Sequence, residues 1–242
     1  MTRPASLVFR GTMIKLFHYP LSVASRFARL VLAECEITPE LVEERYWERR
    51  EDFVIMNPAA TLPVLVENGG PPICGAWPVS EYLDETRGFA LAEHRLLPPN
   101  ADQRAEVRRL SEWFLVQFDA EVTGFLVEEK VIKRERARAG GDGAPDSTLL
   151  RAARSNIRMH MRYIDYLIET RRWLAGDQLT YADLAAAAAI SVADFMGEVP
   201  WQDAEESKDW YARVKSRPAF RPLLADQVRG VRPPAHYPDL DF

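Results

Sequence analysis

The chain has 242 residues, of which 47% are hydrophobic and 28% are charged, and its formal net charge is −5. This length is enough for one large domain or two modest ones with a proper core. The charge balance gives no broad positive field, so we expect no binding to nucleic acid or to an anionic membrane. No apolar stretch reaches the roughly 18 residues that a membrane span needs.

The two cysteines, Cys35 and Cys74, form no CxxC pair and have no metal-ligand neighbours. A disulfide framework would need more cysteines, so the sequence fits a reduced, cytoplasmic compartment and predicts no metal site. Residues 1–12 lack the hydrophobic region and the cleavage site of a leader peptide. We expect a disordered extension there, with Met13 as an alternative start.

Residues 13–88 predict an α/β unit with one mixed sheet. An apolar and aromatic run at 14–19 is stopped by Pro20, as in a buried strand. Apolar residues then recur at helical spacing up to Glu34, and Ser22 or Ser25 can cap this helix. The other predicted elements are an edge strand at 41–47, a hairpin of 63–66 and 72–74 around Glu67–Gly70, and a helix at 77–86.

Residues 89–100 indicate a linker, and the chain from 101 to 225 is predicted to be helical. Apolar residues occupy one face of 101–138, and the same pattern resumes over 149–172 after a glycine-rich loop. The basic run at 130–138 is interleaved with glutamates, which favours a solvated helix end.

A further helix opens at Thr180, whose side chain and that of Asp183 can form a capping box. The prolines from Pro218 onward exclude a long helix in the last part of the chain. Residues 226–242 are therefore predicted to form a proline-rich tail.

Three stretches resemble the cytosolic glutathione-transferase superfamily, and they occur in its order. They are YPLSVASR at 19–26, where the family places a catalytic serine at the start of the first helix, NPAATLPVL at 57–65, like the family's NPxGxVPxL, and WLAGDQLTYAD at 173–183, like its G(D)xxSxAD. The resemblance covers residues 13 to about 225. It implies a thioredoxin-like N-terminal domain over 13–88 and an all-helical C-terminal domain over 101–225.

The resemblance also implies a ligand cleft and two interpretations of Ser22. In serine-type members this hydroxyl favours the glutathione thiolate, which then attacks an electrophile. The alternative is that Ser22 only caps its helix, which is worth about 1 kcal/mol. Pro63 is cis in the family, and the backbone of Leu62 and Val64 lines the glutathione site, which would be vestigial here.

The chain departs from the family seven residues before Tyr82. Active members usually carry a carboxylate and a serine there to bind the γ-glutamyl end of glutathione, whereas this chain has Gly75 and Ala76. Each lost charge-assisted bond costs about 1.5–3 kcal/mol, so two losses imply roughly hundredfold weaker binding or worse. The resemblance then implies no catalytic residue and no cofactor, with Ser22 and glutathione as the alternative.

Two apolar features of the sequence, Trp47 and the tail, indicate a protein partner. Trp47 lies in a strongly charged stretch, where it can form part of an interface or pack on the sheet edge. The tail places apolar residues between acids, and it can pack along its own protein or dock a partner in extended form. The predicted partner-binding residues are Trp47, Arg26, Pro233, Pro234, His236, Tyr237, Asp239, Leu240, Asp241 and Phe242. We expect deletion of 233–242 to weaken binding without unfolding the protein.

The tail and the segment 201–221 resemble a branch of transferase-like cell-division proteins that bind FtsZ filaments. This resemblance implies a non-catalytic, homodimeric regulator of constriction in the cytoplasm, at the division site. The alternatives are a glutathione transferase that acts through Ser22, and a lyase, isomerase or dehalogenase that uses another thiol.

Overall fold

The apolar run that begins at Ile14 forms the central strand of a four-stranded sheet in the computed structural model, which describes residues 13–141 and 143–240. The strands are β1 (Ile14–His18), β2 (Glu40–Glu43), β3 (Val64–Glu67) and β4 (Ile73–Cys74). They lie in the order β2-β1-β3-β4, with β1 parallel to β2 and antiparallel to β3. The predicted sheet and hairpin are confirmed, although β2 ends at Glu43 because the chain then turns into a short 3-10 helix, η1 (Tyr46–Glu48).

Three helices complete the α/β layer: α1 (Val23–Glu34), α2 (Glu51–Met56) and α3 (Ala76–Arg87). The side chain of Ser22 caps α1 by accepting the backbone N–H of Ser25 at 3.2 Å. Helix α1 buries the apolar face that its spacing predicts and packs against both α3 and the helical layer. The expected extension at 1–12 lies outside the described residues.

The linker is more ordered than its composition indicates. It begins with a 3-10 segment, η2 (Gly88–His94), and then reaches the next helix through a series of bends. Leu96 and Leu97 are both buried, and the carbonyl of Leu96 accepts the N–H of Tyr181. The linker is therefore held between the two layers.

One continuous helix runs from Ala101 to Arg138, as predicted. Its parts are α4 (Ala101–Glu112), α5 (Gly124–Val127) and α6 (Lys133–Arg138), joined by the wide turns η3 (Trp113–Gln117), η4 (Asp119–Thr123) and η5 (Glu128–Ile132). In each wide turn an N–H bonds the carbonyl five residues earlier, as from Gly124 to Asp119. A Cβ at Gly124 would lie 2.8 Å from the Asp119 carbonyl oxygen, so this turn requires glycine.

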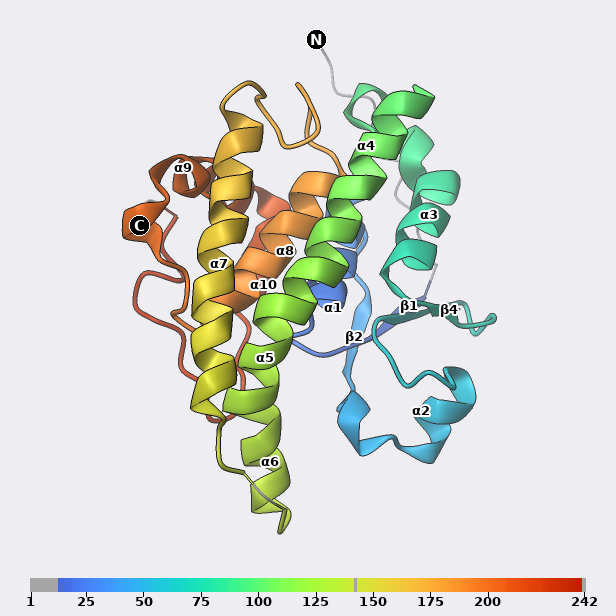
Figure 1. Ribbon diagram of the computed structural model, residues 1–242. Helices are drawn as coiled ribbons and strands as arrows, with labels where there is room; N and C mark the ends of the chain where they lie inside the picture. Colours follow the sequence, from blue (N-terminus) through green and yellow to red (C-terminus); the bar gives the residue numbers. More distant parts are fainter. Residues whose placement is uncertain (1–12, 142, 241–242) are drawn as a thin grey trace.

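The remaining helices surround one that is buried on all sides. They are α7 (Ser147–Ile168), α8 (Tyr181–Phe195), η6 (Trp201–Asp203), α9 (Glu205–Lys215), η7 (Pro218–Phe220) and α10 (Arg221–Leu224). Figure 1 shows α8 in the middle of the molecule, between α7, α4 and α1. Its run of alanines allows this close approach on every face. Among the described helices, none is long and apolar enough to cross a membrane.

The predicted capping box fixes the start of α8. The carboxylate of Asp183 accepts the N–H of Thr180 at 3.0 Å, the N–H of Leu174 at 2.9 Å and the indole N–H of Trp210 at 3.0 Å. Burial raises the pKa of Asp183, although these donors oppose the shift. The same carboxylate thus links the helix start, the preceding loop and α9.

We expect Asp183→Ala to destabilise the protein by about 3–5 kcal/mol, because several buried donors lose their acceptor at once. Urea unfolding followed by circular dichroism measures this loss. Asp177→Ala, in the same loop but exposed, is the matched control and should change the free energy of unfolding by less than about 0.5 kcal/mol. Equal stabilities of the two variants would contradict the structural role of Asp183.

Candidate functional site

The inherited ligand position lies where β1 ends and α1 begins. Phe17 pairs with Val64 across the sheet, so Pro63 lies beside the end of β1, from which the chain leads to Ser22. The Leu62–Pro63 peptide is cis, as predicted. Ser22 is half-buried, whereas the side chains of Leu62, Pro63 and Val64 are buried. The sequence therefore located this set of residues, but their use as a glutathione site stays a prediction.

The entrance of α3 offers backbone groups only. Gly75 begins this helix with a φ of 99° and without a side-chain cap, and Pro78 has no N–H. The N–H of Gly75 is used by the carbonyl of Pro63 at 2.8 Å. No side chain of Gly75 or Ala76 can bind an ammonium or a carboxylate, as the sequence indicated.

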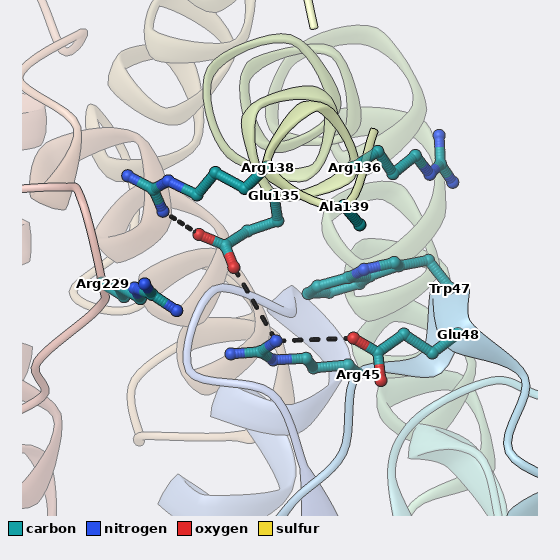
Figure 2. A pocket seen from close by; sticks show the side chains of 8 residues that line it. All are labelled: Arg45, Trp47, Glu48, Glu135, Arg136, Arg138, Ala139 and Arg229. Carbon is teal, nitrogen blue, oxygen red and sulfur yellow. Dashed lines mark hydrogen bonds and ion pairs between the residues drawn. The ribbon is translucent and has the colours of Figure 1, made fainter. Parts of the chain in front are cut away.

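Two neighbouring cavities lie between the α/β layer, the end of α6 and the tail. The larger one, of about 320 Å³, is lined by Arg45, Trp47, Glu48, Glu135, Arg136, Arg138, Ala139 and Arg229 (Figure 2). The second, of about 250 Å³, shares Arg45, Trp47, Glu135 and Arg229 with the first and extends to Tyr19 and Pro20. We call the two together the arginine groove. Neither cavity is lined by Ser22, Pro63 or Val64.

Charges inside the arginine groove are only partly neutralised. The carboxylate of Glu135 forms ion pairs with Arg138 and, at 3.7 Å, with Arg45. Arg45 also contacts Glu48 at 3.4 Å. Arg229 lies in the turn at 228–231 and forms no ion pair with any residue that the structure describes. Of the basic side chains in the run at 130–138, only the arginines at 134, 136 and 138 are exposed, whereas Lys130 and Lys133 are half-buried. Arg138 and Glu135 also shape this groove.

Trp47 packs against two tyrosines and also lines the groove, whereas its role in an interface stays a prediction. Its ring packs edge-on against Tyr19, with centroids 4.9 Å apart, and against Tyr46, at 5.2 Å. It nevertheless stays half-buried and lines both cavities. Figure 2 shows the ring between Arg45 and Ala139, with one side turned to the groove. The charged stretch around Trp47 was the signal for this position.

The tail is anchored by Arg26, Asp226 and Tyr237, which we call the tail latch. The guanidinium of Arg26 donates to the Tyr237 hydroxyl at 2.8 Å and contacts Asp226 at 3.4 Å. Arg29 holds both oxygens of Asp226 at 2.8 Å. The Tyr237 hydroxyl also donates to the carbonyl of Leu223 at 3.2 Å. Of the two interpretations of the tail, packing along its own protein is the one that residues 226–237 show.

His236, the residue before Tyr237, contacts both α8 and α9. His236 Nε2 lies 3.0 Å from Asp194 Oδ1, which also accepts the indole N–H of Trp201 at 2.9 Å. Burial lowers the pKa of Lys215, whose ammonium lies 4.0 Å from the other oxygen of Asp194. Asp194, the second acid in the apolar sequence of α8, was a signal for these contacts, because a buried charge requires partners.

Two of the predicted partner-binding residues are buried inside the chain. Arg26 and Tyr237 are both fully buried, and they bond each other instead of facing a partner. The other residues split between two places: Trp47 lies in the arginine groove, and the tail residues lie by α8 and α9. Among the latter, Pro233 and Asp239 are exposed and Pro234, His236 and Leu240 are half-buried, whereas Asp241 and Phe242 lie outside the described residues.

Comparison with known proteins identifies the architecture. Family models of the glutathione S-transferase N-terminal and C-terminal domains match residues 21–86 and 135–218. FtsZ-localized protein A from Caulobacter vibrioides (strain NA1000 / CB15N) is 46% identical over 230 residues, which cover 94% of this chain and 97% of that protein. The chain belongs to the glutathione S-transferase superfamily.

Solved structures of relatives superimpose on this transferase-like chain over almost its whole length. A glutathione S-transferase from Sinorhizobium meliloti 1021 is 55% identical with a TM-score of 0.92 and covers 95% of this chain and all of its own. FzlA from C. crescentus is 44% identical with a TM-score of 0.87 and the same coverage. The predicted fold, an α/β thioredoxin-like domain followed by helices, is confirmed.

His18, at the end of β1, gives this region a pH dependence. It is 5% exposed, and its Nδ1 has no hydrogen-bond partner among the described residues. Burial lowers its pKa to about 4, and Arg29 and Arg26 oppose protonation further, whereas Asp226 favours it. Because the unfolded chain has a pKa near 6.5, it binds more protons than the folded chain between these two values.

We therefore expect the free energy of unfolding to fall by up to about 3 kcal/mol as the pH drops from about 6.5 to about 4. Urea unfolding across this range measures the slope. His18→Asn should remove this contribution, whereas His94→Asn, at an exposed position, should leave the slope unchanged. A slope of the same size in the His18 variant would exclude this histidine as its source.

A further prediction concerns the hydrogen bond between Tyr237 and Arg26 in the tail latch. Tyr237→Phe removes a hydroxyl that accepts from a buried guanidinium, so we expect a loss of about 1–3 kcal/mol and faster amide exchange at 226–240. Hydrogen exchange with mass spectrometry measures the second effect. Tyr166→Phe, at an exposed aromatic of α7, is the control. Unchanged exchange in the tail would show that the latch does not hold it.

Proposed function

We propose that this protein is a non-catalytic regulator of bacterial cell division that binds FtsZ filaments in the cytoplasm, at the division site. The observation that carries the proposal is its 46% identity, over 94% of the chain, with a protein named for its localisation with FtsZ. The entrance of α3 supports the non-catalytic part, because Gly75 and Ala76 supply no side chain to bind glutathione. The Arg-rich groove beside it offers a different kind of recognition.

The proposal includes a homodimer, in which two identical faces reach two positions of one filament. In the family, the N-terminal domain of one subunit packs on the long helices of the other. Val116 supports such a contact, because it is 52% exposed on the long helix. It lies one turn beyond Glu112, which accepts the indole N–H of Trp77 from α3 at 3.0 Å. Trp77 is therefore bonded to the long helix one turn before Val116.

Partner contacts are proposed at two places. One is Trp47 with the rim of the arginine groove, since a half-buried tryptophan beside arginines is typical of interface hot spots. The other is the tail beyond the latch, from Asp239 onward. The latch holds Tyr237 against Arg26, so the proposed contact begins after this residue.

A glutathione transferase is the second candidate. Ser22 favours it, because this half-buried serine lies at the start of α1, where the positive end of the helix stabilises a thiolate. The relative from Sinorhizobium meliloti is itself described as a glutathione S-transferase. The missing side chains at 75 and 76 speak against tight binding of the tripeptide. Calorimetry with millimolar glutathione separates the two candidates.

Co-pelleting with polymerised FtsZ tests the proposed function. We expect Trp47→Glu to weaken binding about tenfold or more, because it places a charge at a packed aromatic. A chain that ends at Pro238 should weaken binding too while it keeps the latch. Tyr166→Glu, at an exposed aromatic of α7, is the control and should bind normally.

The chain that ends at Pro238 takes the place of the deletion of residues 233–242. The longer deletion removes Tyr237, which is buried against Arg26, so it would destabilise the fold and confound the assay. Normal co-pelleting of a variant that combines Trp47→Glu with the end at Pro238 would remove both places from the interface. Failure of the unaltered protein to pellet with FtsZ would overturn the function itself.

A further inference from the structure

The arginine groove carries a surplus of positive charge in a chain that is negative as a whole. Four arginines and two glutamates line its larger cavity, whereas the net charge of the chain is −5. The arginines come from three separate segments: the residues after β2, the end of α6 and the turn at 228–231. The fold thus gathers like charges into one place, and its own carboxylates neutralise them only in part.

Among the described residues, the arginines of the larger cavity form ion pairs with glutamates, with the exception of Arg229. Glu135 is shared between Arg45 and Arg138, and Arg136 pairs with Glu128, at 2.6 Å, instead of with a groove residue. Arg229 is exposed and forms no ion pair among the described residues. Figure 2 shows Arg229 on the same side of Glu135 as Arg45. The guanidinium of Arg138 lies against Gly230, the neighbour of Arg229, so a carboxylate from another molecule can be held between Arg138 and Arg229 by charge-assisted bonds.

The shape of the groove favours an extended ligand with an apolar side chain. The second cavity continues the first past Trp47 to Tyr19 and Pro20, so charged and aromatic walls follow each other. Glu48 and Glu43 lie along the same groove, one in each cavity. A continuous phosphate backbone or an anionic lipid surface would meet these carboxylates, whereas a peptide can place its acids selectively.

We propose that the arginine groove binds an extended acidic segment of a partner protein, with its carboxylates on Arg138 and Arg229 and an apolar side chain on Trp47. This inference rests on the proposed function and specifies the chemistry of the segment that is recognised. The attraction acts within a Debye length of about 10 Å at 0.1 M salt, so binding should weaken as salt rises. Arg229 sets the specificity for a carboxylate, because it is the arginine of the larger cavity that forms no ion pair with the described residues.

Fluorescence anisotropy with a labelled synthetic peptide tests the proposal. The probe alternates aspartate with leucine and phenylalanine, and its control carries asparagine in place of every aspartate. We expect the unaltered protein to bind the acidic probe, and to bind it at least about tenfold more tightly than the control at low salt. Equal affinity for both probes, or no binding of the acidic one, would overturn the proposal.

Arg229→Glu supplies the matched variant, since its side chain is exposed and supports no ion pair of the fold. It should weaken binding of the acidic probe about tenfold or more. Arg172→Glu makes the same charge change at an exposed position just after α7, which is 22 residues or roughly 33 Å long. This control should bind the probe as the unaltered protein does. Equal weakening in both variants would show that only net charge matters and would overturn the groove as the site.

Two further measurements separate this inference from the proposed function. Millimolar glutathione should not displace the probe, and displacement would assign the groove to a tripeptide instead of a protein segment. Co-pelleting with FtsZ is measured on the same variants. If Arg229→Glu pellets normally and the probe does not bind, the groove proposal fails while the function stands. If the probe binds through Arg229 but the unaltered protein never pellets with FtsZ, the proposed function fails while the groove stands.

Discussion

The buried guanidinium of Arg26 is the charge around which this structure is organised. It is fully buried, and it donates to the carbonyl of Pro20 at 2.6 Å, to Ser191 at 2.9 Å and to Tyr237 at 2.8 Å. A buried charge is tolerated only when such partners surround it, and loss of a partner typically costs about 3–5 kcal/mol. Here the partners belong to the loop before α1, to α8 and to the tail. One side chain therefore joins the α/β layer, the helical layer and the end of the chain.

This arrangement also determines the shape of the arginine groove. The segment from Asp226 to Tyr237 is held at both ends by the tail latch, and the turn that carries Arg229 lies between them. The turn then forms a wall of the groove beside Arg138, whose guanidinium lies against Gly230. A tail without its latch would leave this side of the groove open. Anchoring of the tail and construction of the groove are thus one structural feature.

The ancestral ligand position and the arginine groove are neighbours with different chemistry. The first retains the cis Pro63 and a helix-capping Ser22, but the entrance of α3 has only backbone to offer. The second collects guanidiniums and a half-buried tryptophan, as protein interfaces do. Tyr19 and Pro20, which lead into α1, line the groove and so connect the two places.

Local patterns in the sequence determined the elements, because helix periodicity, capping residues and turn glycines act over a few residues. They gave the sheet and hairpin, the long helix at 101–138, the capping box at Thr180 and the position of Trp47. Tertiary structure alone decided which charges are buried and which carboxylates form ion pairs with two arginines at once. Arginine is usually found at the protein surface. The partners of Arg26 are as many as 211 residues away along the sequence. Long-range pairing of this kind leaves no periodic trace in the chain, so the tail latch and the arginine groove became visible only when the layers were packed together.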